Sequence, residues 1–305
     1  MMAAQKLSWQ PDMRNVRGRL LENEPMSRHT SWRLGGPADW YFVPADLKDL
    51  QQFIGELPGD MPIYWIGLGS NLLVRDAGIR GVVIGTHKGL AAIQQVDGQL
   101  VRAEAGVASA QVARFCGRQH MMGAEFLAGI PGSFGGALAM NAGAFGGETW
   151  DIVDSVEVID RKGTVVTRKA DEFSPAYRHI DIEASNWFVA ATIRLRSGDS
   201  SQSKSEILSL LKRRGDSQPV QSANAGSVFR NPPGDHAARL IEACGLKGTR
   251  SGGAEVSEKH ANFIINHGDA SAADVEALIT TVQREVKTQC GVELVPEVRF
   301  VGAAK

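Results

Sequence analysis

The sequence predicts an α+β fold divided into two domains. Its 305 residues are enough to form more than one hydrophobic core. Short apolar segments with the two-residue alternation of strands fill residues 29–196, with few helices between them. Helical periodicity is concentrated after residue 204. This order is typical of an α+β protein whose second domain is smaller and more helical.

The individual elements follow from local signals. Alternating apolar residues bounded by Gly, Pro or Asp-Gly turns indicate strands, and a 3.6-residue apolar stripe indicates a helix. Asp46, Ser109 and Ser271 stand where N-caps are expected, and a polar linker covers residues 197–205. The predicted strands are residues 39–43, 63–66, 72–74, 82–84, 93–96, 99–103, 152–160, 164–168, 187–195 and the strand-like 292–302. The predicted helices are residues 16–22, 47–57, 109–120, 204–214, 235–244 and 271–290.

The stretch around which the chain is organised is residues 123–147. Seven of the 22 residues from 126 to 147 are glycine and none is charged. So much glycine argues against a membrane helix, and it suits a backbone that approaches a ligand closely or takes positive φ. We interpret the stretch as a buried, irregular segment against something flat or anionic. The alternative is a tightly turned core crossing with no ligand.

A second glycine loop, Gly-Leu-Gly-Ser-Asn, occupies residues 67–71. It resembles a dinucleotide fingerprint, but the third glycine is missing and strand-forming residues follow where the helix of that motif should start. The backbone N–H groups, with a Ser hydroxyl and an Asn amide, would still suit a pyrophosphate. A plain β-turn explains this motif equally well.

The charge and the cysteine content exclude several kinds of partner and site. Lys and Arg number 33 and Asp and Glu 34, with no basic block, so neither nucleic acid nor a membrane surface is expected as a partner. The three cysteines are widely spaced and odd in number, which predicts no metal site and no disulfide framework, as in a reducing cytoplasm. Residues 1–15 lack the apolar core of a signal peptide, and no transmembrane helix is expected.

Four polar residues stand at positions that need an explanation. Arg178 precedes a strand and is either a surface residue or a fixed guanidinium for a carboxylate or an enolate. Ser227 has the only side-chain hydroxyl in an apolar turn, where it is either a cap or functional. Glu297 lies in an apolar final strand, either on its solvent face or as a functional carboxyl. His260 is either a ligand contact or a structural histidine.

Seven segments in one order resemble the UDP-N-acetylenolpyruvoylglucosamine reductase family over roughly residues 28–302. Each motif is weak alone, and the colinear set is specific. The segments are HTSWRLGGPADWYFVP, GLGSNLLVRDAGIRGVVI, GAEFLAGIPGSFGGALAMNAGAFGGE, Tyr177-Arg178, AGSVFRNP, VSEKHANFIIN and LVPEVRFVG.

The resemblance implies a flavin-binding domain of the vanillyl-alcohol-oxidase (PCMH) type in residues 1–200, in two subdomains of about 1–85 and 86–200. A smaller α+β substrate-binding domain follows in residues 201–291, and residues 292–305 return to the flavin-binding region. The cofactor is non-covalent FAD. The implied cofactor-binding residues are Arg33, Gly67, Leu68, Gly69, Ser70, Asn71, Leu72, Ile130, Pro131, Gly132, Ser133, Gly136, Ala137, Asn141, Ala142 and Gly143.

The resemblance also implies the reaction. NADPH reduces FAD, and the flavin then delivers hydride to UDP-N-acetylglucosamine enolpyruvate, which gives UDP-N-acetylmuramate for peptidoglycan. The implied catalytic residues are Arg178, Ser227 and Glu297, with Ser227 as proton donor. Tyr177, Arg214, Asn224, Arg230 and His260 are the expected substrate contacts. The candidates for the UDP diphosphate are the cations near the domain junction, Lys212, Arg213, Arg214 and Arg230. Such an enzyme would act in the bacterial cytoplasm in cell-wall biogenesis, and so in cell shape, the cell cycle and cell division, and a monomer is favoured.

Two departures from the family pattern matter. The long form of the family carries a Tyr-bearing insertion after the strand at residues 187–195, and only a short polar segment stands there, so the chain resembles the short form. Ile180 occupies a position where the family often has Ser, which changes the expected hydrogen-bond support of Arg178.

Two alternative functions remain open. One is an FAD-dependent oxidase of an alcohol or lactone, with His29 near the region of covalent attachment. The other is a non-enzymatic flavin- or nucleotide-binding module.

Overall fold

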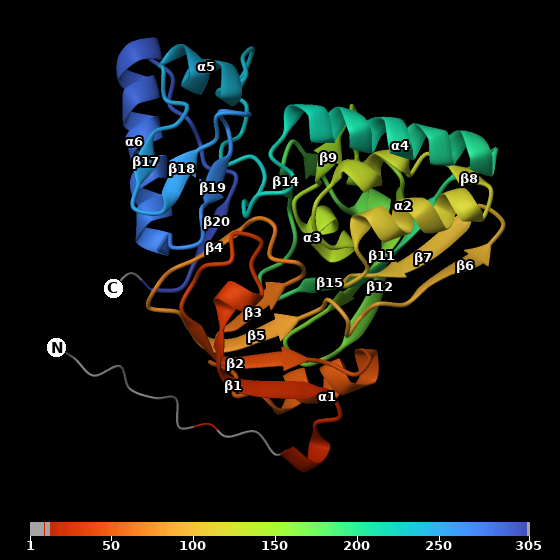
Figure 1. Cartoon of the computed structure of the whole chain (residues 1–305). Helices are drawn as coiled ribbons and strands as arrows, with labels where there is room; N and C mark the ends of the chain where they lie inside the picture. Colours follow the sequence, from red (N-terminus) through yellow and green to blue (C-terminus); the bar gives the residue numbers. More distant parts are fainter. Residues whose placement is uncertain (1–8, 10–12, 304–305) are drawn as a thin grey trace.

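The computed structural model describes residue 9 and residues 13–303, and it confirms the α+β class. Two sheets and a separate C-terminal lobe make up the molecule (Figure 1). The helices are α1 (Leu47–Glu56), α2 (Ser109–Arg118), α3 (Phe134–Ala139), α4 (Ser200–Ser217), α5 (Ala237–Ala243) and α6 (Ala272–Cys290). In the described part of the chain, no helix is both long and apolar enough to span a membrane. The expectation for the N-terminal signal region falls mostly outside the described residues.

The first sheet has the strand order β1-β2-β5-β3. β1 (Arg19–Pro25) pairs antiparallel with β2 (Pro37–Val43), whereas β5 (Ile79–Gly85) runs parallel to both β2 and β3 (Ile63–Ile66). α1 packs on this sheet through Leu50, Phe53 and Ile54. Asp46 caps α1 as predicted, since its side chain accepts a hydrogen bond from the Asp49 N–H.

The second sheet is antiparallel throughout. Its order is β12-β11-β15-β7-β6, formed by Val165–Lys169, Val153–Ile159, Trp187–Arg194, Leu100–Glu104 and Ile93–Asp97. Helices α2, α3 and α4 lie over one face of it (Figure 1). α4 contributes Ile207 to the core of this sheet and packs against α2. By its contacts α4 is therefore part of this layer, although the sequence placed residues after 200 in the substrate-binding domain.

The C-terminal lobe combines a three-stranded sheet, β17-β18-β19, with α5 and α6. Its strands are Arg250–Ser251, Ala254–Val256 and Ile264–Asn266. Trp32 and Leu73, from the N-terminal part of the chain, are buried in the same core. The short strand β20 (Arg299–Val301) then leaves the lobe and pairs in parallel with β4 (Leu72–Val74), directly after the loop at residues 67–71.

Four local predictions are wrong. Of the strand-like segment 292–302, only Arg299–Val301 forms a strand. Residues 16–22 do not form a helix; the segment enters β1, because its backbone pairs with β2. The polar segment 197–205 is not a linker throughout, since α4 begins at Ser200 behind the cap Asp199. Ser109 is the first residue of α2 rather than its cap, and its buried hydroxyl has no hydrogen-bond partner among the described residues.

Candidate functional site

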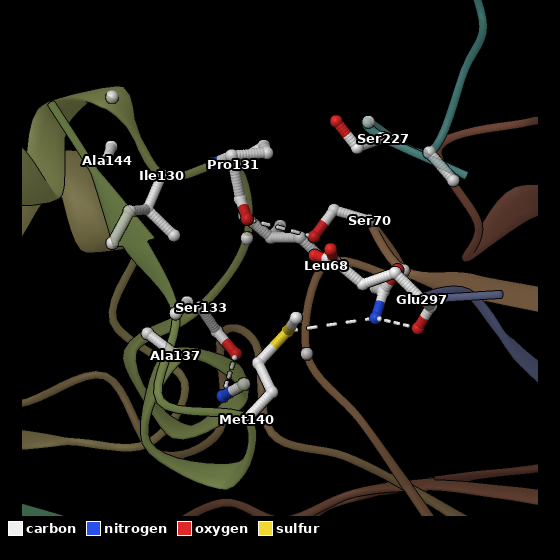
Figure 2. A pocket seen from close by; sticks show the side chains of 18 of the residues that line it. Leu68, Ser70, Ile130, Pro131, Ser133, Ala137, Met140, Ala144, Ser227 and Glu297 are labelled. Atoms are coloured by element: carbon white, nitrogen blue, oxygen red, sulfur yellow. Dashed lines mark hydrogen bonds between the residues drawn. The ribbon is translucent and has the colours of Figure 1, made fainter. Parts of the chain in front are cut away.

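One cavity of about 480 Å³ brings the two glycine stretches together. The loop at residues 67–71 forms one wall, and residues 129–145 form the facing wall (Figure 2). Ser70 Oγ donates to the Pro131 carbonyl at 3.0 Å and ties the two walls together. Ser227 and Glu297, which follow in the C-terminal part of the chain, also line the cavity. Segments about 60, 150 and 230 residues apart along the chain thus share one site.

Glycine at positions 67 and 69 is required by close packing. A Cβ on Gly67 would lie 1.9 Å from Ser133 Oγ, across the gap between the walls. Gly69 has φ of +63°, and a Cβ there would lie 2.1 Å from the His29 carbonyl oxygen. Ser31 binds the Gly69 carbonyl through both its N–H (3.1 Å) and its hydroxyl (3.2 Å). The loop is therefore held in a conformation that only glycine adopts without strain.

Gly132 and Ser133 shape the facing wall. Gly132 has φ of +116°, and a Cβ on it would meet Ser70 Oγ at 2.5 Å. Ser133 caps α3, with its hydroxyl accepting from the Gly136 N–H at 3.4 Å. At Gly67, Gly69 and Gly132 the walls present backbone without a side chain, so a flat ligand can approach the backbone there. This supports the ligand-binding interpretation of the stretch over the empty core crossing.

Arg178 and Glu297 face each other at the cavity. Arg178 Nε lies 3.3 Å from Glu297 Oε1, within ion-pair distance but not aligned as a hydrogen bond, so this buried N–H has no hydrogen-bond partner among the described residues. Arg178 Nη2 donates to the Gly143 carbonyl at 3.3 Å. The backbone of Arg178 has φ of +56°, which is uncommon for a residue with a side chain. A fixed guanidinium with a spare donor suits an anionic ligand.

The Glu297 carboxyl is buried, with 11% of its side chain exposed. Burial raises its pKa above the ordinary value, and the positive charges of Arg178 and Arg230 offset only part of that rise. Its backbone N–H donates to the Val228 carbonyl at 2.7 Å, and its carbonyl accepts from Asn71 Nδ2 at 3.1 Å. Glu297 is thus held by the Ser227 segment on one side and by the loop at residues 67–71 on the other.

Ser227 lines the cavity one residue after Gly226, which has φ of +73°. Asn262 fixes Phe229, two residues further on, since its side chain accepts from the Phe229 N–H at 2.9 Å and donates to the Phe229 carbonyl at 2.8 Å. The Ser227 hydroxyl makes no hydrogen bond to another described residue. It is a free donor on a rigid segment at the cavity surface.

Two arginines of α4 also line the cavity. The Arg214 Nε donates to Gln218 Oε1 at 3.0 Å, and burial lowers its pKa. Arg214 has no carboxylate partner within ion-pair distance in the described part of the chain, so it is a partly buried cation without a counter-ion. Arg213 is exposed and lies over the ring of Phe145, with 5.6 Å from its Cζ to the ring centroid. Positive charge therefore borders the side of the cavity that α4 forms.

Most of the predicted site residues line this cavity, and six do not. Asn141 is buried beside it, with its amide bound to Glu148 Oε2 and the Ala176 carbonyl. Asn224 uses its side chain within its own turn, donating to the Pro219 and Ser222 carbonyls. Arg230 lies behind Arg178, and its Nη2 donates to the Arg178 carbonyl at 3.5 Å. The other predicted residues outside the lining are Arg33, Tyr177 and His260.

The sequence analysis missed several lining residues. Met140 is one of them, with its Sδ 3.7 Å from Asn71 Nδ2 (Figure 2). No local signal marks a lone methionine in an apolar segment as part of a site. Arg213, by contrast, was marked by its charge as a candidate for the substrate diphosphate, and it lines the cavity. The remaining missed residues are Trp65, Ile66, Gly129, Ala139, Ala144, Phe145, Ser217, Gln218, Ala225, Gly226, Phe263 and Arg299. Among the described residues, no cluster of acidic, His and Cys side chains could hold a metal ion.

The raised pKa of Glu297 predicts a pH-dependent stability. Below about pH 4 the carboxyl is protonated in both the folded and the unfolded chain. As the pH rises the unfolded chain ionises first, so the folded state loses stability until the pH passes the raised folded pKa. Glutamine stays neutral, so Glu297→Gln is expected to have the higher Tm at about pH 7.5, with the difference closing near pH 4.

Calorimetry across this pH range measures the effect. Glu293→Gln is the control, since the Glu293 side chain is 72% exposed and should change the Tm little at any pH. A lower Tm for Glu297→Gln throughout the range would mean that the ion pair with Arg178 outweighs the burial of the carboxylate.

Comparison with known proteins gives consistent matches. A family model described as "FAD binding domain" matches residues 38–168, and the model of the C-terminal domain of UDP-N-acetylenolpyruvoylglucosamine reductase matches residues 218–301. A protein of that name from Alkalilimnicola ehrlichii is 56% identical over 94% of this chain and 96% of its own length. The Methylococcus capsulatus protein of the same name is 55% identical over 95% of each chain.

A solved structure agrees with the sequence matches. The crystal structure of UDP-N-acetylenolpyruvylglucosamine reductase from Thermus caldophilus superposes with a TM-score of 0.81 at 30% identity. The alignment covers 94% of this chain and all of the Thermus chain.

Proposed function

Because the chain belongs to the UDP-N-acetylenolpyruvoylglucosamine reductase family, we propose how its own residues carry out the family's reaction. That reaction is the NADPH-dependent, FAD-mediated reduction of UDP-N-acetylglucosamine enolpyruvate to UDP-N-acetylmuramate in peptidoglycan synthesis. The oxidase alternative is not favoured, since relatives at 55–56% identity over nearly the whole chain are reductases. His29 stacks on Tyr41 and bonds Glu24, so it has structural partners of its own.

The residues of the cavity fit FAD. Gly67 and Gly132 leave bare backbone where a Cβ would collide with the facing wall, and Gly69 does so where a Cβ would collide with the backbone of His29 and Thr30. We assign the pyrophosphate to the N–H groups of residues 67–71 and the flavin ring to the wall formed by residues 129–145. When bound, FAD passes hydride from NADPH to the enolpyruvyl group of the substrate. The Asn141 side chain is proposed to support the turn at Gly143 rather than to contact the cofactor.

Arg178 and Glu297 are proposed to hold the carboxylate end of the enolpyruvyl group. The unsatisfied Nε of Arg178 is a donor for negative charge that builds up on the carboxylate as hydride arrives. Glu297, whose pKa is raised by burial, is proposed to be protonated when it contacts that carboxylate. Its proton turns a like-charge repulsion into a hydrogen bond.

Ser227 is proposed to deliver the proton to the adjoining carbon. Ser227 lines the cavity. The residue after it, Val228, accepts a hydrogen bond from the Glu297 N–H, which joins the segments that carry Ser227 and Glu297. The rigid attachment of the Ser227 segment through Asn262 keeps the donor in one place. Colocation of Arg178, Ser227 and Glu297 in one cavity is the observation that carries this proposal.

Arg214 is proposed to bind the diphosphate of the substrate, since it is a partly buried cation with no counter-ion among the residues that the structure describes. Replacing it by Met should raise the KM for the enolpyruvyl substrate about 10- to 100-fold, the loss of one charge-assisted hydrogen bond, with kcat little changed. Steady-state kinetics at saturating NADPH measure this. Lys212→Met is the control, because Lys212 is exposed and paired with Asp216. An unchanged KM would contradict the assignment.

Arg230 was expected to contact the same diphosphate, and its position behind Arg178 favours a supporting role. Arg230→Met is therefore expected to lower kcat more than it raises KM, because it loosens Arg178 and removes a charge that lowers the pKa of Glu297. An upward shift of the pH profile of substrate reduction should accompany it. A rise in KM alone would restore the diphosphate assignment.

The decisive experiment for the reaction is an anaerobic absorbance spectrum of the purified protein. NADPH should bleach the yellow flavin, and UDP-N-acetylglucosamine enolpyruvate should restore the colour. Reoxidation by oxygen alone would favour the oxidase. A colourless protein that cannot be reconstituted with FAD would contradict the cofactor assignment.

We propose a boundary near residue 218 between the flavin-binding region and the substrate-binding lobe, because α4 packs on the second sheet and the C-terminal family model begins at that residue. Residues 292–305 are proposed to return to the flavin-binding region through β20. The cytoplasmic location and the monomeric state also belong to the proposal; cell fractionation and light scattering test them.

A further inference from the structure

Two of the three cysteines meet in the C-terminal lobe, away from the cavity. Cys244 follows the last residue of α5, and Cys290 is the last residue of α6. Their Sγ atoms are 3.6 Å apart. The two helices lie side by side at one end of the lobe (Figure 1). The sequence separation had given no reason to expect this contact.

The two thiols differ in their surroundings. Cys290 is exposed, and the positive charge of Arg239 lies within electrostatic range of it. Cys244 is half-buried; burial, a hydrogen bond with Cys290 and the nearby negative charge of Glu285 raise its pKa to about 11. By exposure, Cys290 is thus the thiol that an oxidant reaches first, and Cys244 is the thiol beside it that can resolve the product.

We propose that Cys244 and Cys290 are a redox-reactive dithiol, which a peroxide converts into an intramolecular disulfide between α5 and α6. A disulfide needs the sulfur atoms about 2.05 Å apart, so the 3.6 Å contact has to shorten by about 1.5 Å. Side-chain rotation at two helix ends, one of them exposed, accommodates a movement of that size.

The chemistry balances with hydrogen peroxide as oxidant. The Cys290 thiolate attacks one peroxide oxygen, the O–O bond breaks and water leaves after protonation, which gives a sulfenic acid. Cys244 sulfur then attacks the Cys290 sulfur, the S–O bond breaks and a second water leaves. Two thiols lose two electrons and two protons, and one peroxide becomes two waters. A dithiol reductant reverses the cross-link by thiol–disulfide exchange.

The cross-link would close the chain from residue 244 to residue 290, which includes β17, β18, β19 and α6. Closing a loop of this length restricts the unfolded chain and stabilises the lobe. We expect the Tm of the oxidised protein to exceed that of the reduced protein by about 5 °C or more. This inference does not depend on the proposed reaction, because neither cysteine lines the cavity.

The test uses the full-length protein with FAD bound, treated with hydrogen peroxide and then freed of it. Thiol counting after denaturation should fall from three to one, and non-reducing peptide mapping should recover the Cys244 and Cys290 peptides joined, with two hydrogens lost. Dithiothreitol should restore all three thiols and reverse the rise in Tm.

Variants separate this pair from the third cysteine. Cys116 is buried, so Cys116→Ser should keep the oxidation-dependent Tm shift, whereas Cys290→Ser and Cys244→Ser should lose it. If a variant fails to fold, the reversible rise in Tm of the unaltered chain still tests the proposal. Three thiols persisting after peroxide, a disulfide-linked dimer through Cys290, or a cross-link that leaves the Tm unchanged would each overturn the proposal.

Discussion

Replacing Ser227 by alanine is expected to slow reoxidation of the reduced flavin by the enolpyruvyl substrate about 10²- to 10⁴-fold. NADPH should still bleach the flavin at the normal rate. The split arises because the proton is needed only when the substrate is reduced. The hydroxyl lines the cavity without another described partner, so its removal leaves no buried group unsatisfied and the fold should be unaffected.

Anaerobic stopped-flow absorbance measures the two half-reactions separately. Ser217→Ala is the matched control, because Ser217 also lines the cavity but its hydroxyl donates to the Arg213 carbonyl at 3.0 Å. Both half-reactions should stay near normal in that variant. If Ser227→Ala slowed flavin reduction and reoxidation equally, the residue would not be the proton donor.

Gly69→Ala is expected to yield a protein that does not retain FAD. The added Cβ would lie 2.1 Å from the His29 carbonyl oxygen and 2.8 Å from Thr30 Cα, both in backbone that cannot yield like a flexible side chain. Relief requires the loop at residues 67–71 to move, which displaces the N–H groups assigned to the pyrophosphate. The protein should purify colourless, with FAD affinity reduced at least 100-fold, a cost of about 3 kcal/mol.

Flavin content and fluorescence titration with FAD measure this effect. Gly291→Ala is the control for the backbone conformation itself, since Gly291 has φ of +72° and nothing within 4 Å of a Cβ. That variant should lose about 1 kcal/mol of stability and keep its flavin. A yellow Gly69→Ala protein with one FAD per chain would exclude this loop as the pyrophosphate site.

Local chemistry made several parts of the molecule predictable. Asp46 and Ser271 cap their helices as expected, because a cap depends on a few adjacent residues. Gly291 ends α6 with the left-handed backbone that the sequence indicated. The excess of glycine predicted backbone segments that approach other atoms closely, and both glycine-rich stretches line the one cavity.

Contacts between distant segments were not predictable in this way. Nothing near Cys244 indicates that Cys290 lies beside it, and nothing in residues 197–205 indicates that the helix capped by Asp199 packs on the second sheet. The helix expected near residues 16–22 failed because pairing with β2 outweighed local preference. For the same reason, Arg230 was recognisable as a cation of interest while its place behind Arg178 was not.

The pairing of β20 with β4 determines when the site is completed during synthesis and folding. Arg299 lies opposite Leu72, so the strand that follows Glu297 meets a partner synthesised more than 200 residues earlier. Contacts of such long sequence separation form slowly, and a chain emerging from the ribosome cannot form this one until residues 299–301 have emerged. Until then the flavin-binding region lacks Glu297 at the cavity. The site is therefore completed late in folding, and activity is acquired late as well.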